Sequence, residues 1–325
     1  MKNKYSIFTF ISFLIFFQFQ AFCQESSAKL SIAPEFGFVN GKIVEDVWNI
    51  KASTSGNTIT YTPTTKMSRL DWQMENSFYF GFNSDLVIND KLNFWLSFKN
   101  AISRDCGVME DYDWLNPVTS AWKDDPADEL TNYSIHINHL ENMIQTTLCA
   151  GWTFYLNQSK SISLTPRFGF EFEDISFCGN DGWGTYKSNN WQKTSFEDKV
   201  ISYSQWFIAP VLALNADFNI GRYFETTLDL SVIWIKNLDC IDRHYIRSLL
   251  FNDRIEDVWK LGAELNLFYK LNKMNKIGLK GNISFMPEAY GFTYSSKTDT
   301  SPDASTMGGT NRLLWTYAFV YVLSF

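Results

Sequence analysis

Bulky and small side chains alternate along the C-terminal end of the chain, and this pattern constrains the fold more than any other feature. Counting back in twos from the end, the bulky residues are Phe325, Leu323, Tyr321, Phe319, Tyr317 and Trp315. The residues between them, such as Ala318 and Ser324, are smaller. A strand with one bulky and one small face fits lipid on one side and a packed lumen on the other. The pattern therefore predicts a membrane-spanning strand of a β-barrel.

The N-terminal segment 1–23 is typical of a secretory signal peptide, with Lys2 and Lys4 before an apolar stretch. Cys23 allows a lipoprotein as the alternative, but Phe22 is bulky for the residue before a lipidated cysteine. No later run reaches the roughly 18 apolar residues of a membrane helix. Because 17% of the residues are aromatic, as lipid-facing barrel girdles require, we expect residues 24–325 to form a barrel in the outer membrane.

The rest of the chain divides into similar segments, and we expect an all-β, ten-stranded antiparallel transmembrane barrel. The expected strands are 29–40, 68–83, 91–103, 131–155, 161–178, 199–219, 222–237, 255–271, 276–292 and 311–325. Short links alternate with long ones, and the long links are 41–67, 104–130, 179–198, 238–254 and 293–310. Short periplasmic turns and long extracellular loops produce this alternation. Side chains should largely fill so narrow a lumen, which argues against a general diffusion porin.

Charge and cysteine content narrow the function classes. Removing the two lysines of residues 1–23 leaves 26 basic and 35 acidic residues, a net charge of −9. This balance argues against a nucleic-acid partner. The remaining cysteines are Cys106, Cys149, Cys178 and Cys240. An exported protein can form disulfides, but free thiols are an equal alternative.

Of the three histidines, His244 is the candidate for chemistry. His136 and His139 are three apart in a strand pattern, so they should face opposite sides and share no metal. His244 lies two residues after Asp242, so in extended chain both side chains share a face. A carboxylate beside an imidazole orients it as a general base. The alternative is a solvated loop with ordinary charges.

The expected second loop contains a pair of carboxylates, Asp111 and Asp113, that should share one face. Close carboxylates can hold and polarise a water molecule. Seven acids and one base, Lys123, lie between positions 110 and 129. The segment could equally be a solvated acidic loop or a weak calcium site.

Several short segments, taken in order, resemble the omptin family of outer-membrane proteases. They are Asn40-Gly41-Lys42-Ile43-Val44-Glu45, Leu70-Asp71-Trp72, Asp111-Tyr112-Asp113-Trp114, Asn132-Tyr133 and Asp242-Arg243-His244-Tyr245. The resemblance covers nearly the whole chain after residue 23. It implies a ten-stranded barrel whose active site lies in a groove at the extracellular rim.

The resemblance also implies a mechanism without metal or acyl-enzyme. His244, oriented by Asp242, would take a proton from water that Asp111 holds with support from Asp113. Glu45 matches the acid of the primary specificity pocket, so the expected substrates are cationic peptides or proteins, and the acidic second loop agrees with this. The family's second pocket acid is replaced by Cys240, and Asp239 next to it would point the opposite way.

Two further positions depart from the family's lipopolysaccharide-binding arginines. Asp174 and Trp206 stand where these arginines would lie, and neither can pair with a phosphate as guanidinium does. We therefore expect no cofactor and a weak or absent dependence on lipopolysaccharide, in a monomer surrounded by outer-membrane lipid. The alternative function is a non-catalytic omptin-like barrel that acts as an adhesin or surface-binding protein.

Overall fold

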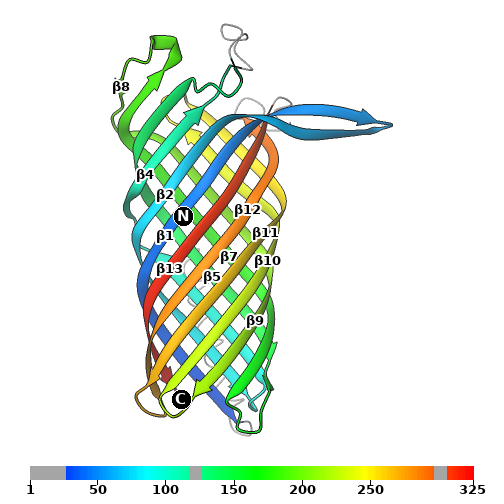
Figure 1. Cartoon of the computed structure of the whole chain (residues 1–325), viewed down its shortest axis with the longest axis vertical. Coiled ribbons are helices and arrows are strands. Elements are labelled where there is room, and N and C mark those ends of the chain that lie inside the picture. Colours follow the sequence, from blue (N-terminus) through cyan, green and yellow to red (C-terminus); the bar gives the residue numbers. More distant parts are fainter. Residues whose placement is uncertain (1–26, 117–125, 296–305) are drawn as a thin grey trace, which may run out of the picture.

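The computed structural model describes residues 27–116, 126–295 and 306–325, which form one closed antiparallel sheet (Figure 1). Its long strands are β1 (Ala28–Ser55), β2 (Thr58–Ile88), β3 (Leu92–Ala101), β4 (Arg104–Asp113), β5 (Asn132–Trp152), β7 (Ile162–Tyr186), β9 (Lys199–Ile220), β10 (Phe224–His244), β11 (Leu249–Lys270), β12 (Asn275–Ser295) and β13 (Thr306–Ser324). Short pieces are β6 (Phe154–Tyr155), β8 (Thr194–Ser195) and the 3-10 turn η2 (Lys187–Asn189). No helix within these ranges is long and apolar enough to cross a membrane. The expected signal peptide, 1–23, lies outside the described residues.

The ring contains ten strands, as the sequence predicts. β3 and β4 are the lower and upper parts of one barrel strand, because both pair with β2 on one side and β5 on the other. β6 and β8 each add only a two-residue pairing to β7. The ring closes where β1 pairs with β13. A closed sheet leaves no barrel strand without a hydrogen-bonded neighbour on either side.

The outward face carries the predicted bulky residues. Trp315, Tyr317 and Phe319 are 45–50% exposed, whereas Ala318 and Val320 between them are buried. This apolar outer band stops where charged pairs begin. Lys42 Nζ lies 2.6 Å from Asp71 Oδ2 on β1 and β2, and Lys236 Nζ lies 3.0 Å from Asp257 Oδ2 on β10 and β11. The strand segments beyond these pairs therefore stand outside the apolar band.

The turns at the other end are short, as predicted. Asn89 and Asp90, between β2 and β3, both have positive φ, 53° and 58°, and Lys91 donates its backbone N–H to the Ile88 carbonyl at 3.1 Å. This is the left-handed turn whose twist matches a two-residue hairpin. The C-terminal Phe325 lies at this end too, bonded through its backbone to Leu30.

The outer ends of the strands were predicted wrongly. Most of the expected loop 41–67 is strand, and its tip is a hairpin that projects from the mouth of the barrel (Figure 1). The expected loops 104–130, 179–198 and 238–254 likewise begin with β4, the end of β7 and the end of β10. Both faces of these segments carry polar residues, because neither meets lipid. The apolar alternation that reveals a strand is therefore missing, although the hydrogen-bonded ladder continues.

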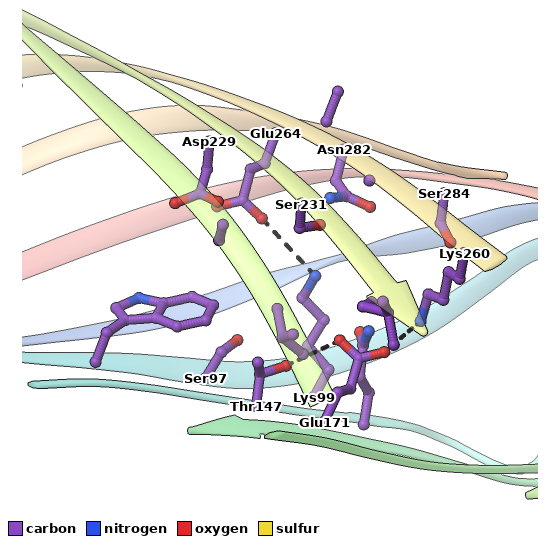
Figure 2. A pocket seen from close by; sticks show the side chains of 17 residues that line it. Ser97, Lys99, Thr147, Glu171, Asp229, Ser231, Lys260, Glu264, Asn282 and Ser284 are labelled. Atoms are coloured by element: carbon purple, nitrogen blue, oxygen red, sulfur yellow. Dashed lines mark hydrogen bonds and ion pairs between the residues drawn. The ribbon is translucent and has the colours of Figure 1, made fainter. Parts of the chain in front are cut away.

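Side chains fill the middle of the lumen. Lys260 Nζ lies 2.5 Å from Glu171 Oε1 and 2.6 Å from Glu173 Oε2, and Arg312 also binds Glu173. Figure 2 shows Lys99 and Glu264 closing the next layer, around a cavity of about 60 Å³. A larger cavity of about 580 Å³ lies toward the short-turn end. The four cysteines among the described residues are free and buried, so the structure favours the free thiols of the two alternatives.

Candidate active site

Opposite walls of the barrel meet just above the lumen plug. The Trp72 ring of β2 stacks on Phe177 of β7 and Tyr203 of β9, with ring centroids 6.0 and 5.8 Å away. In addition, Gln205 Nε2 of β9 donates to Thr310 Oγ1 of β13 at 2.7 Å. These strands are not neighbours in the sheet, so the contacts cross the lumen. These contacts close the lumen directly below the outer-rim residues, and we call them the floor of the site.

One wall above this floor carries the predicted histidine–aspartate pair. His244 is the last residue of β10 rather than part of a long loop, and its Nε2 lies 2.6 Å from Asp242 Oδ2. The side chains are only 15% and 6% exposed. Asp242 pairs in register with Tyr203, the ring that stacks on Trp72. Arg247 Nη2 donates to His244 Nδ1 at 2.5 Å.

The facing wall carries the predicted aspartate pair on β4, again on a strand rather than in a loop. Asp111 Oδ1 accepts from Ser68 Oγ at 3.3 Å, and Asp113 Oδ2 accepts from Asn132 Nδ2 at 2.9 Å. Burial raises the pKa of Asp111 well above its ordinary value, and the charge of Asp113 raises it further. Asp111 therefore keeps its proton more readily than an exposed aspartate does.

Glu45 and Asp111 lie in one row of paired residues, with Leu70 between them. The register of β13, β1, β2 and β4 sets Thr310 opposite Glu45, Glu45 opposite Leu70, and Leu70 opposite Asp111. Glu45 is 2% exposed, and its Oε2 accepts from Trp72 Nε1 at 3.3 Å. Burial raises its pKa well above the ordinary value, and Asp242, Asp253 and Asp111 add to the rise.

The two walls are also linked electrostatically. The positive charge of Arg247, which contacts His244, lowers the pKa of Asp111, whereas the charge of Asp242 raises it. Tyr186 at the end of β7 has its pKa raised, first by burial and then by Asp111 and Asp113, while Arg247 lowers it. The aspartate pair, the histidine–aspartate pair and Arg247 thus influence one another across a single mouth.

Sequence reasoning missed Asp253 and Arg247. Asp253 on β11 is 3% exposed and pairs in register with Cys240. Burial raises its pKa to about 7. The register follows from the tight turn at 245–248, and the expected loop 238–254 concealed it. Had the sequence analysis assumed a four-residue turn at 245–248, pairing outward from it would have set Cys240 opposite Asp253.

The other two histidines lie on opposite faces, as predicted. His136 is buried, with Nδ1 2.5 Å from the Asp181 carbonyl. His139 lies on the outer face, where Nδ1 is 2.7 Å from Asp105 Oδ1 and Nε2 is 2.9 Å from Ser103 Oγ. In the ranges that the structure describes, no group of three or more His, Cys, Asp or Glu side chains is arranged to hold a metal ion.

Asp174 and Trp206 are register partners on β7 and β9. Trp206 is 42% exposed, and Asp174 Oδ2 accepts from Asn142 Nδ2 at 2.9 Å. The pair presents an acid and an indole on the outer wall, at the upper edge of the apolar band.

Comparison with known proteins gives consistent results. The model of the Omptin family matches residues 27–314. The plasminogen activator of Yersinia pestis is 25% identical over 293 residues, 87% of this chain and 84% of that protein. The outer membrane protease IcsP of Shigella flexneri is 24% identical over 276 residues, 82% and 80% of the two chains. The crystal structure of outer membrane protease OmpT from Escherichia coli superposes with a TM-score of 0.76 at 18% identity, covering 91% of this chain and 97% of that one.

Proposed function

Because this chain belongs to the omptin family, we propose that it is an outer-membrane endopeptidase that cleaves peptide bonds next to basic residues. Two relatives are named as a plasminogen activator and an outer membrane protease, which supports peptide or protein substrates. The observation that carries the proposal is the buried 2.6 Å contact between His244 and Asp242, on the wall that faces Asp111 across the mouth.

In the proposed mechanism His244 is the general base and Asp242 orients it. Since Nε2 faces Asp242, Nδ1 is the nitrogen that accepts a proton. A water molecule takes the place of Arg247 at Nδ1, and Asp111 holds it from the facing wall. Asp113 supports Asp111, and two close carboxyl groups readily share one proton.

The reaction then needs no further group. The water oxygen forms a bond to the carbonyl carbon while its proton passes to His244 Nδ1. The imidazolium returns this proton to the amide nitrogen as the carbon–nitrogen bond breaks. The products are a carboxylic acid, which keeps the second proton of the water and then ionises by releasing it to solvent, and an amine, and His244 is neutral again.

The fold supports a proposal for the orientation of the site and for the oligomeric state. We propose that the site faces the extracellular side, because it lies at the end opposite the short turns and Phe325. We propose a monomer in outer-membrane lipid, since the ring closes within one chain and leaves no strand edge for a partner.

We also propose activity without lipopolysaccharide, because Asp174 and Trp206 offer no cation for its phosphates. The refolded protein should cleave a peptide equally well in detergent with and without lipopolysaccharide. Activity that appears only on its addition would contradict this.

The decisive experiment compares substitutions on the two walls. Asp111→Asn and His244→Ala should each lower kcat/KM for a fluorogenic Arg-Arg peptide by a factor of roughly 10² to 10⁴. His139→Ala is the matched control, because this histidine also contacts an aspartate but on the outer wall. Cleavage that survives both rim substitutions would reject the site. If binding to matrix proteins were the measurable activity and survived both, the adhesin alternative would replace the protease.

A further inference from the structure

We propose that Asp253, together with Glu45, binds the cationic side chain of the substrate and so determines specificity, an inference that rests on the proposed function. Asp253 takes the role of an acid that Cys240 cannot fill. The argument depends on where Asp253 lies, what it lacks, and what surrounds it.

Asp253 lies on the lumen side of the rim, directly across from Cys240. The two residues are register partners on β11 and β10, and both side chains are buried. Asp239 and Arg254, the next pair in the ladder, point to the outer face because side chains alternate along a strand. Position 240 on β10 carries no acid, but its register partner on β11 does, and both side chains lie on the same face.

The carboxyl group of Asp253 has no partner for one of its oxygens. Asp253 Oδ1 is buried without a hydrogen bond, and so is Asp242 Oδ1. Glu45 has Trp72 as its hydrogen-bond donor. In the part of the chain that the structure describes, neither Glu45 nor Asp253 has a lysine or arginine within ion-pair distance. Buried acids without a counter-charge are costly in a folded protein, and a bound cation removes the cost.

Asp253 and Glu45 belong to one electrostatic cluster. Glu45 lies on β1 and Asp253 on β11, and the charges of Asp253 and Asp242 both raise the pKa of Glu45. A guanidinium or ammonium group between Glu45 and Asp253 would offset the negative charge of both carboxylates at once. Arginine fits best, because its planar guanidinium group can bond to carboxylates on different sides.

The backbone of β13 makes room for this carboxyl group. A Cβ placed on Gly308 would lie 2.0 Å from Asp253 Cγ, so any side chain at 308 would displace the acid. Gly308 therefore leaves space for Asp253 against β13, two residues closer to the outer end than the row that holds Thr310 and Glu45.

The test uses two quenched peptides that differ in one residue, arginine or its neutral isostere citrulline. Wild type should prefer arginine, and Asp253→Asn should lower the ratio of the two kcat/KM values roughly 30-fold or more, mainly through KM for the arginine peptide. Asp239→Asn is the matched control: it removes the same charge from the adjacent ladder position but on the outer face, and should keep the ratio.

A charge transplant tests the geometry. In the double variant Cys240→Asp with Asp253→Asn, the acid moves across the strand pair on the same face, and most of the arginine preference should return. Asp253→Asn that keeps the wild-type ratio, or a transplant as unselective as the single variant, would overturn the proposal.

A binding measurement separates this inference from the proposed function. Fluorescence anisotropy of the labelled arginine and citrulline peptides with Asp111→Asn protein requires no turnover. If the wild-type protein cleaves neither peptide, but Asp111→Asn binds the arginine peptide and the double variant Asp111→Asn with Asp253→Asn does not, the endopeptidase assignment fails and the cation site stands. If cleavage depends on Asp111 and His244 but arginine and citrulline peptides are equivalent, the endopeptidase stands and the cation site fails.

Discussion

The barrel contains two histidine–aspartate pairs of almost equal length in different surroundings. His244 Nε2 lies 2.6 Å from Asp242 at the rim, and His139 Nδ1 lies 2.7 Å from Asp105 on the outer wall. The outer pair even has Ser103 Oγ 2.9 Å from the second imidazole nitrogen. By contact geometry alone, Ser103, His139 and Asp105 are arranged as in a serine-hydrolase triad. The rim pair, in contrast, has Arg247 and no hydroxyl group at its second imidazole nitrogen.

The surroundings separate them. Asp242 is 6% exposed at its side chain, whereas Asp105 is 71% exposed, so water screens the outer pair. The rim pair faces Asp111 and lies among buried acids, whereas the described contacts of His139 are limited to Ser103 and Asp105. A pair of residues becomes a candidate catalyst through burial and through a second group that holds the reacting water.

The largest effect expected from this contrast is on peptide hydrolysis. Asp242→Asn should lower kcat/KM about 10³-fold, because the imidazole loses the carboxylate that orients it. Asp105→Asn makes the same chemical change at the outer pair and should alter kcat/KM less than about twofold. Steady-state assays on the refolded proteins measure both. Equal losses would mean that the environment does not distinguish the pairs.

The second effect is on stability. Burial raises the pKa of Asp253 to about 7 from 3.8. The folded protein therefore holds a proton that the unfolded chain releases, and stability falls as pH rises from about 4 to about 7. Asp253→Asn removes this loss, so above pH 7 the variant should be more stable by up to about 4 kcal/mol.

Urea unfolding followed by tryptophan fluorescence, at pH 4 and pH 8, measures this difference. The outer-wall variant Asp105→Asn is the control and should differ from wild type by no more than about 0.5 kcal/mol at either pH. An Asp253→Asn protein that loses stability at pH 8 would show that the carboxylate has a counter-charge in the folded protein.

The third effect concerns the second nitrogen of each imidazole. Arg247 Nη2 donates to His244 Nδ1, and in the proposed mechanism a water molecule takes its place there. Arg247→Ala should therefore raise kcat for a good substrate by about two- to tenfold, the worth of one hydrogen bond. Arg243→Ala, one residue before His244 and exposed, is the control. A fall in kcat would indicate that Arg247 assists the reaction.

The smallest effect is expected at Ser103. Because Asp105 and Ser103 are solvent-exposed, the hydroxyl should react with a fluorophosphonate probe no faster than other surface serines. Mass spectrometry of the labelled protein, with Ser103→Ala as the control, checks this. Selective labelling of Ser103 would give the outer wall a nucleophile and end the contrast.

The sequence predicted the lipid-level half of the barrel well because lipid imposes a pattern on it. Trp315, Tyr317 and Phe319 face outward as alternation requires, and turn residues such as Asn89 mark the short links. Above the lipid no such pattern exists, so strands were taken for loops. The same-face relation of Asp242 and His244 still held, because it depends only on extended backbone.

What the sequence could not show are contacts that cross the lumen or a strand pair. Trp72 meets Tyr203 only because the closed ring sets β2 and β9 across a narrow lumen from each other. Asp253 opposes Cys240 only because the turn after His244 is short. Both contacts depend on the register of every strand pair and on where the ring closes. No short stretch of the sequence encodes either of these.

The seam between the first and last strands runs through the candidate site itself. Thr310 of β13 donates to the carbonyl of Val44, the residue before Glu45 on β1. Its hydroxyl group also accepts from Gln205 across the lumen. Without the pairing of β13 with β1, Glu45 lacks its register partner Thr310, and Gly308 does not lie against Asp253. If Glu45 and Asp253 form the proposed cation site, a chain whose first and last strands have not yet paired lacks that site, because the β1–β13 ladder sets Glu45 opposite Thr310 and brings Gly308 against Asp253.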